Sequence, residues 1–564
     1  MDIDALLPCA SASAFATVGP DRQGHRRALS RYQGSGTAEV IFLWHAARIR
    51  WPFDRLLGQD RAVRHDLHGL AENPALPSEL VDRLIAAADT DLAEVLACRP
   101  DLIGTQVAAL ARFEGAAVRL ARAGRFAAED VDPLAHPRVA LALLEAGSGR
   151  PEWARLLAAD PLVDNREKLA ACPGLPRDVT QTLACDPDVR VVAELALWAT
   201  TDVAAELAAH PHASVRRAVA ANEAAPPAAL AALLTGVGLP PARSCLVCDR
   251  EPIPFVHDPN CPRPDCALPP GASCDGSHES TVHEIQQLAL RNPATPVDAA
   301  VGFADHSSTL LRCELAARTD LPQHLYARLA EDSVPWVRAH LADNPAIDEG
   351  TIRALAFDRG HDVQRRLAHH PRLPLDVLSH LAEATRIGST LLPRIGSAST
   401  AEAEELAASP NSTLRMLIAQ RRDLPTGLRD ALARDPDAKV LESIAPHPGL
   451  SEAQLRAMVA SHGVRVMAKV AANPDTTSSL LEDLAQHRPP VRKAFREIAR
   501  HSNATAAALL ACLTDRQARP WAAGHRALPP AIIVELLDDE DWQVVKAAAA
   551  NPSLLHAAMA RLVP

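Results

Sequence analysis

Residues 332–356 read DSVPWVRAHLADNPAIDEGTIRALA, and this stretch decides the fold. Its apolar residues fall at helical spacing twice, first in VRAHLA and again in TIRALA. Between the two runs stands Asn344-Pro345, and a proline there prevents one continuous helix. Each run is far shorter than the roughly 12–15 residues that an isolated helix needs in water. The stretch therefore predicts two short helices that become stable only by packing against neighbours.

The same pattern recurs along the chain as D-x-x-V-R-x-x-L-A-x-N-P-x-L-P-x-x-x-L-x-x-L-A, so the fold is a repeat fold. With the proline as anchor, neighbouring anchors lie 24–28 residues apart, except for a 51-residue step that holds two units and a 70-residue step in mid-chain. The anchors are Pro74, Pro100, Gly124, Gly149, Pro173, Ala199, Glu223, Pro293, Thr319, Pro345, Pro371, Arg422, Pro448, Pro474, Ser502, Arg526 and Pro552. Roughly 18 units fit this column, which predicts an all-α solenoid whose repeats contact only their neighbours.

The composition agrees with thin helical layers. Apolar residues make up 48% of the 564 residues but aromatic residues only 3%, so burial has to come from many Ala, Leu and Val contacts. The formal net charge of −11 opposes attraction to phosphate backbones and anionic lipids, so nucleic acid is an unlikely partner.

Residues 1–56 do not show the repeat and contain Trp44, Trp51 and Phe53. We interpret them as an N-terminal cap for the first unit, with a small separate binding domain as the alternative. The start of the chain lacks the basic and apolar regions of a secretory signal, and no apolar run approaches the roughly 18 residues of a membrane span. We therefore expect a cytoplasmic protein without a membrane segment, in which clustered cysteines hold metal more readily than they form disulfides.

The period near 25, the Pro-x-Leu-Pro link and the paired short helices resemble the leucine-rich-repeat-variant (LRV) family over about residues 57–235 and 283–564. The resemblance implies units that alternate an α-helix with a 3₁₀-helix in a right-handed superhelix, distantly related to HEAT and armadillo arrays. It also implies a cysteine-rich iron–sulfur segment in some members, and it implies no reaction. This chain differs from the founding pattern because its cysteines lie in mid-array.

The 70-residue step exceeds an ordinary repeat by about 44 residues, and this excess is a cysteine-rich insert. The expected organisation is a cap at 1–56, a repeat array at 57–235, the insert at 236–282 and a second array at 283–564. The insert is rich in proline and poor in aliphatic residues, so metal binding would have to supply its folding energy. Its candidate ligands are Cys245, Cys248, Cys261, Cys266, Cys274 and His278.

The identity of the metal stays open between zinc and an iron–sulfur cluster. Two thiol pairs, Cys245-x-x-Cys248 and Cys261-x₄-Cys266, have spacings that suit a tetrahedral zinc site, but Cys274 is then a fifth thiol. Residues 274–278 read CDGSH and resemble the pentapeptide of CDGSH iron–sulfur proteins, which implies three cysteines and one histidine around a two-iron cluster. That family has an upstream Cys-x-Cys pair, which this chain lacks.

The remaining cysteines are scattered at alanine-rich repeat positions, and we interpret them as small buried hydrophobic residues. They are Cys9, Cys98, Cys172, Cys185, Cys313 and Cys512.

Recurring Val-Arg pairs predict a row of arginines along one face of the array. The pairs end at Arg64, Arg190, Arg216, Arg338 and Arg492, and aspartates precede many units at Asp60, Asp186, Asp332 and Asp358. We expect an Asp–Arg ladder between neighbouring units, with phosphate binding as the alternative. Histidines near the asparagine column, such as His370 and His501, are interpreted as substitutes that cap turns.

No catalytic motif stands out, so we expect a non-enzymatic scaffold that binds a protein partner on the solenoid surface. An iron–sulfur redox or sensor protein is the first alternative. A HEAT-like nucleic-acid-binding protein is the second.

Overall fold

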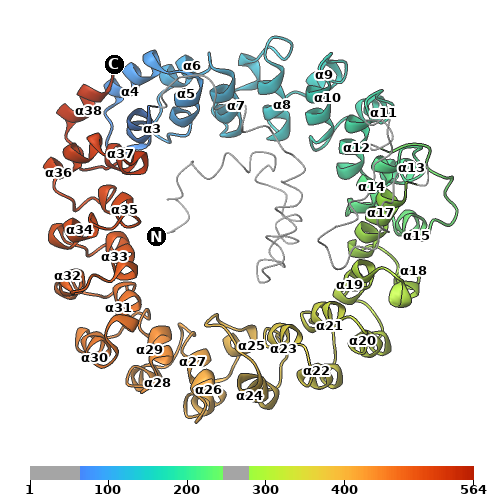
Figure 1. Ribbon diagram of the computed structural model, residues 1–564. Helices are drawn as coiled ribbons and strands as arrows, with labels where there is room; N and C mark the ends of the chain where they lie inside the picture. The colour runs from blue at the N-terminus through green and yellow to red at the C-terminus, as the bar shows by residue number, and fades with distance from the viewer. Residues whose placement is uncertain (1–63, 246–277) are drawn as a thin grey trace. The chain divides into compact units, whose positions relative to one another are not determined.

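The computed structural model describes residues 64–245 and 278–564 and is helical throughout these two ranges (Figure 1). No strand occurs within them, and one isolated β-bridge joins His212 to Ser244. The predicted all-α solenoid is confirmed, because short helices alternate with proline-containing links along both ranges.

Each repeat pairs a first helix, which ends at the asparagine column, with a second helix that follows the link. The first helices are α3 (His65–Glu72), α5 (Thr90–Leu96), α7 (Glu114–Arg122), α8 (Pro137–Glu145), α10 (Val163–Ala170), α12 (Val189–Trp198), α14 (Ala213–Ala221), α17 (Glu279–Arg291), α19 (Thr309–Ala317), α21 (Pro335–Ala342), α23 (His361–Leu367), α27 (Ser412–Ile418), α29 (Ala438–Ile444), α31 (Val464–Ala471), α33 (Arg492–Arg500), α35 (Arg519–Ala523) and α37 (Trp542–Ala549). The short helix α25 (Pro393–Gly396) lies in the irregular stretch before Arg422.

The second helices form the other row of the array. They are α4 (Ser78–Ala87), α6 (Gly104–Leu110), α9 (Pro151–Leu157), α11 (Arg177–Ala184), α13 (Thr201–Leu207), α15 (Pro227–Thr235), α18 (Val297–Ala300), α20 (Gln323–Ala330), α22 (Glu349–Ala356), α24 (Leu375–Ala384), α26 (Thr400–Ala407), α28 (Thr426–Leu432), α30 (Glu452–His462), α32 (Ser478–Gln486), α34 (Ala506–Cys512), α36 (Pro530–Glu535) and α38 (His556–Leu562). Three 3₁₀ segments, η4 (Ala128–Asp130), η5 (Val301–Asp305) and η6 (Leu536–Asp538), complete the described elements.

Most described units therefore pair two α-helices. The LRV resemblance implies an α-helix followed by a 3₁₀-helix, and only η4, η5 and η6 are 3₁₀ segments in the described ranges. A second helix such as α20 contains eight residues with Leu325, Tyr326 and Leu329 buried on one face, and this apolar face supports a full α-helix.

Contacts divide the described residues into two compact units. One unit contains the described residues up to Arg150 together with Leu509–Pro564, and the other contains Pro151–Ala508. In the second unit the first helices pack in series from α10 through α12, α14, α17, α19, α21 to α23, and again from α27 to α33. Small and branched aliphatic side chains fill the layers between them, and Leu183, Leu195 and Leu230 are fully buried. The prediction that Ala, Leu and Val supply the core is confirmed.

In several repeats the asparagine at the end of the first helix bonds to a neighbouring repeat. The side-chain amide of Asn344 donates to the carbonyls of Ala316 and Arg318 at 2.7 and 2.6 Å, and its Oδ1 accepts from the main-chain N–H of Ala346. The same bonding pattern, here called the asparagine ladder, recurs at Asn73, Asn222, Asn292, Asn473 and Asn551.

These asparagines have extended backbone, not left-handed backbone. Asn73 has φ −68° and Asn292 has φ −70°, both extended, because a following proline disfavours helical backbone in the residue before it. Asparagine is needed instead for its amide, which satisfies buried carbonyls at the end of the previous helix.

In the first unit the ladder also joins the two ends of the described chain. Helix α3 packs against α37, beside it in Figure 1. Asn73 donates to the carbonyls of Ala549 and Asn551 at 2.9 and 2.8 Å, and Lys546 forms an ion pair with Glu72 at 2.9 Å. We call this contact between α3 and α37 the seam. It has the bonding of an ordinary contact between consecutive repeats.

Candidate functional site

Two of the six predicted metal ligands lie within the described ranges. Cys245 and His278 are the described residues on either side of 246–277, and they are 1% and 3% exposed. Cys248, Cys261, Cys266 and Cys274 lie outside the described residues. Across residues 64–245 and 278–564, no three His, Cys, Asp or Glu side chains gather closely enough to hold a metal ion. The metal site therefore stays a prediction.

The solenoid holds the first residues of the insert firmly. The main-chain N–H of Arg243 donates to Pro211 O at 2.7 Å, and the N–H of Ala213 donates to Ser244 O at 2.9 Å. These bonds are the β-bridge noted above, and they fix the backbone directly before Cys245 against the N-terminus of α14. The backbone that carries Cys245 is therefore held in place by main-chain hydrogen bonds to the array.

Arg216 on α14 provides a second anchor for the insert. Its guanidinium donates to His210 O at 2.6 Å and to Pro240 O at 2.8 Å. Burial lowers the pKa of this arginine, which has carbonyl partners where other repeats supply an aspartate. At the start of the insert, the arginine of the predicted row therefore binds main-chain carbonyls and not an aspartate.

The insert ends at His278, in a conformation that is unusual for a residue with a side chain. Its φ is +57°, and no other non-glycine residue of the described ranges has positive φ. Such backbone costs of order 1 kcal/mol or more and persists only where its surroundings enforce it. His278 directly precedes α17, which packs on α14. Asn292 then donates to Ala220 O and Asn222 O, so the asparagine ladder continues across the insert.

The scattered cysteines agree in part with the interpretation as buried hydrophobic residues. Cys172, Cys313 and Cys512 are buried, and burial raises the pKa of the Cys512 thiol to about 12. Cys98 is half-buried, and Cys185 is exposed, which makes the interpretation wrong for Cys185. Cys185 follows the last turn of α11, beyond the buried face that ends at Leu183. Cys9 lies outside the described residues.

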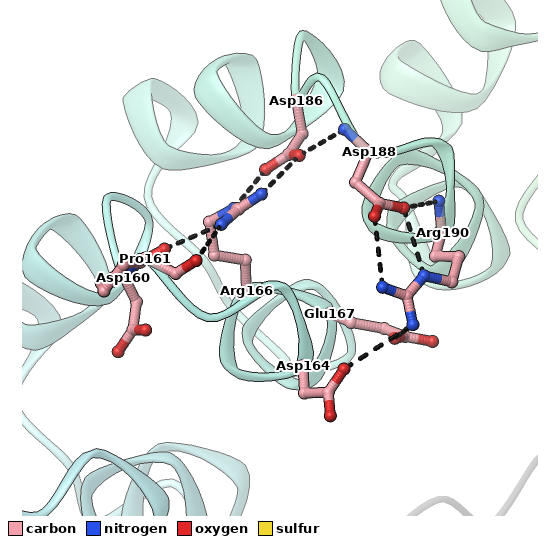
Figure 2. Close-up of polar contacts among 8 residues, drawn as sticks. All are labelled: Asp160, Pro161, Asp164, Arg166, Glu167, Asp186, Asp188 and Arg190. Atoms are coloured by element: carbon pink, nitrogen blue, oxygen red, sulfur yellow. Dashed lines mark hydrogen bonds and ion pairs between the residues drawn. The ribbon is translucent and has the colours of Figure 1, made fainter.

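The Asp–Arg ladder exists, although some of its members differ from those predicted. Figure 2 shows Arg166 paired with Asp186, its Nε atom 2.7 Å from Oδ2, while Nη1 donates to Asp160 O. The predicted Arg190 instead turns to Asp188 at 3.2 Å, with Asp164 and Glu167 farther away.

The same geometry recurs along the second unit, where each arginine pairs with an aspartate twenty residues later in the sequence. The pairs are Arg312–Asp332, Arg338–Asp358 and Arg415–Asp435, with distances of 2.7, 2.6 and 2.7 Å. Burial opposes ionisation of Asp358, yet its pKa is lowered because bonds from Arg338 and from the Gly360 N–H outweigh that cost. These guanidiniums are satisfied by carboxylates and carbonyls and do not present a row of uncompensated charge.

Histidines in or beside the asparagine column cap turns, as predicted. His370 accepts the N–H of Arg372 at Nδ1, and its Nε2 lies 3.0 Å from Asn344 O. His501 makes the corresponding contacts with Asn503 and Asn473.

The first unit also has a pocket that the sequence did not predict. It has a volume of about 1240 Å³ and lies beside the seam. Two half-exposed tryptophans, Trp521 on α35 and Trp542 on α37, line it and are 53% and 51% exposed. Its remaining lining includes Glu72, Arg516, Gln517, Arg519, Asp539, Glu540, Asp541, Gln543 and Lys546. We call this feature the tryptophan pocket.

Charged side chains surround the two indoles. Lys546 pairs with Glu72 across the seam, and Arg519 forms a short ion pair with Asp539. Beyond these pairs, the lining offers the carboxylates of Glu540 and Asp541 against the guanidinium of Arg516. The tryptophan pocket is therefore aromatic with a small excess of negative charge.

Sequence reasoning missed this pocket because its two tryptophans lie one repeat apart and show no motif. A signal was available. Trp521 lies within the first helix of its repeat and Trp542 is the first residue of the next first helix, and most other first helices have small or aliphatic residues there. The wall contributed by Glu72 comes from the other end of the chain, and no local pattern indicates that.

No protein-family model matches the chain, and no curated protein matches it. Among the solved structures that match is a chain of the Pds5–Scc1 complex, with 13% identity over 88% of this chain and 72% of that chain. Its TM-score is 0.15, and two chains that superpose so poorly give no basis for transferring a function. Among the helices of the described ranges, none has the length and apolar character to cross a lipid bilayer.

Proposed function

We propose that this protein is a non-enzymatic scaffold that binds a protein partner through the tryptophan pocket. The pocket carries the proposal, because tryptophan and arginine dominate the energetic centres of protein interfaces. Trp521 and Trp542 keep about half of their surface exposed, although most large apolar side chains of the described residues are buried.

The pairing of the row's arginines with aspartates favours a protein partner over nucleic acid. Binding to a phosphate backbone needs cations that can release condensed counterions. Arg312, Arg338 and Arg415 are instead held by aspartates and are mostly buried. The net charge of −11 acts in the same direction.

The insert adds a metal centre to this scaffold in our proposal. Cys245, Cys248, Cys261 and Cys266 would hold the metal, with Cys274 or His278 as an additional ligand. Support comes from the two described candidates, since Cys245 and His278 are buried and each is backed by a packed helix. A bound metal would supply the folding energy that the proline-rich insert lacks. The LRV resemblance favours an iron–sulfur cluster, and the thiol spacing favours zinc.

The docking proposal is tested by affinity capture with the full chain from native lysate. The captured protein is identified, purified and titrated against wild-type chain, Trp521→Ala and Phe357→Ala. Phe357 is a suitable control because its ring is 71% exposed and lies in the other unit. We expect at least about tenfold weaker binding for Trp521→Ala, as for an interface hot spot, and no change for Phe357→Ala. Equal affinities for all three chains would contradict the proposal.

A further inference from the structure

The tryptophan pocket opens where the described part of the chain begins. The His65 ring stacks on the Trp542 ring with centroids 4.7 Å apart, and Trp542 lines the pocket. The first described residues, Arg64 and His65, therefore lie next to this pocket. A segment of about 20 residues next to Arg64 has access to it without a long linker.

The sequence of that segment matches the pocket in chemistry. Residues 41–57 read IFLWHAARIRWPFDRLL, with four aromatic side chains at Phe42, Trp44, Trp51 and Phe53. The segment has three arginines, at positions 48, 50 and 55, and one acidic residue, Asp54, so it is basic. An aromatic, basic segment complements a pocket that has exposed indoles and an excess of carboxylates.

We propose that residues 41–57 of this chain dock in the tryptophan pocket and occupy the surface that a partner would use. This inference rests on the proposed function, because it names the resident occupant of the same site. The proposed contacts are aromatic packing on Trp521 and Trp542 and ion pairing with Glu540 and Asp541.

Chain connectivity favours this occupant over a separate molecule. Six residues lie between Leu57 and Arg64, and the seven steps from one to the other span at most about 24 Å at roughly 3.4 Å per extended residue. A tethered segment of this kind experiences an effective concentration in the millimolar range, far above that of a second copy in dilute solution. An external partner then has to displace the segment.

The test is hydrogen exchange of the full chain, followed by mass spectrometry of peptides from residues 41–57. In the wild-type chain these amides should exchange at least about tenfold more slowly than an unstructured peptide of the same sequence. Trp521→Ala should remove most of the protection, and Phe357→Ala should leave it unchanged. A second variant, Arg48→Glu with Arg50→Glu, alters only the segment and should also remove it, so the result does not depend on the folding of α35.

Three results would overturn the inference. They are exchange at the unstructured rate in the wild-type chain, protection that survives Trp521→Ala, and protection that rises with protein concentration, which would indicate a second copy. The two proposals fail separately. Trp521→Ala can affect the two measurements differently. If it weakens binding of the captured partner but leaves the exchange of residues 41–57 unchanged, the proposed docking surface is supported and the proposed docking of residues 41–57 is contradicted.

Discussion

The side-chain amide of Asn73 donates to the main-chain carbonyl of Asn551 at 2.8 Å, although 478 positions separate these residues in the sequence. Asn551 in turn donates to His525 O at 3.0 Å, as any ladder asparagine does to the repeat before it. The first described repeat thus packs on the last in the way that consecutive repeats pack. The seam therefore has a stability that can be measured like that of any other contact between repeats.

Replacing Asn73 with alanine should destabilise the protein by about 1–3 kcal/mol, because two buried carbonyls, Ala549 O and Asn551 O, lose their donor. Chemical denaturation measures this change. Asn344→Ala, within the second unit, is the matched control and should cost a similar amount. A much smaller effect at Asn73 would show that the seam does not persist in solution.

Removing residues 526–564 should disturb both sides of the seam. An open array would lose stability only in the repeat before the cut, around α35. Here the deletion also uncovers α3, which packs on the removed helix α37 with Gly69 against the Lys546 main chain. We expect faster amide exchange in α3 as well as in α35. Unchanged exchange in α3 would argue against the observed packing.

Replacing Asp358 with asparagine should weaken the Asp–Arg ladder. Arg338 keeps its bond to Asp332 O but loses a carboxylate 2.6 Å away in a mostly buried site. A cost of about 1–3 kcal/mol is expected, because a buried guanidinium then lacks its counter-charge. Thermal melts in low and high salt measure it. Asp362→Asn, at an exposed ion pair with Arg365, should cost less than about 1 kcal/mol.

Acid should destabilise the protein through His447. Burial, together with the nearby Arg422 guanidinium, lowers the pKa of His447 to about 4, whereas the unfolded chain has the ordinary value of 6.5. The unfolded state therefore binds more protons between pH 6.5 and 4, and stability falls as the pH decreases through that window. The contribution of His447 is complete above pH 6.5, and its loss at pH 4 is about 1–3 kcal/mol.

The matched variant for this effect is His447→Asn, which places the usual ladder residue in the column without a titrating ring. Its free energy of unfolding should fall less between pH 6.5 and 4 than that of the wild-type chain. Other buried histidines with lowered pKa, such as His370, keep part of the dependence. Identical pH profiles for the two chains would contradict the assignment.

Replacing Cys245 and Cys248 with serine should abolish the metal binding proposed for the insert and leave the solenoid helical. The array continues across the insert through Asn292 and Asn222, so its packing does not depend on the metal. Elemental analysis after anaerobic purification measures zinc and iron, and circular dichroism measures helix content. Cys185→Ser, at an exposed cysteine of the array, is the control. Less than about half an equivalent of either metal in the wild-type chain would argue against a structural site.

The sequence by itself determined the repeat, because its signals are local. Helical spacing in residues 332–356, the break at Asn344-Pro345 and the recurrence of both along the chain are readable without coordinates. The same column located the insert between Glu223 and Pro293, and the bond from Asn292 to Asn222 shows that these units are neighbours.

Only the tertiary structure decided which distant groups meet. Asp186 and Asp332 accept from Arg166 and Arg312, which do not follow valine and so escaped the Val-Arg pattern. The seam and the tryptophan pocket bring residues near position 70 together with residues near 540. Sequence periodicity fixes how each repeat folds and packs on the next, but it carries no information about which surfaces meet after many repeats. Contacts between residues so far apart in the sequence leave no local pattern, and coordinates are needed to see them.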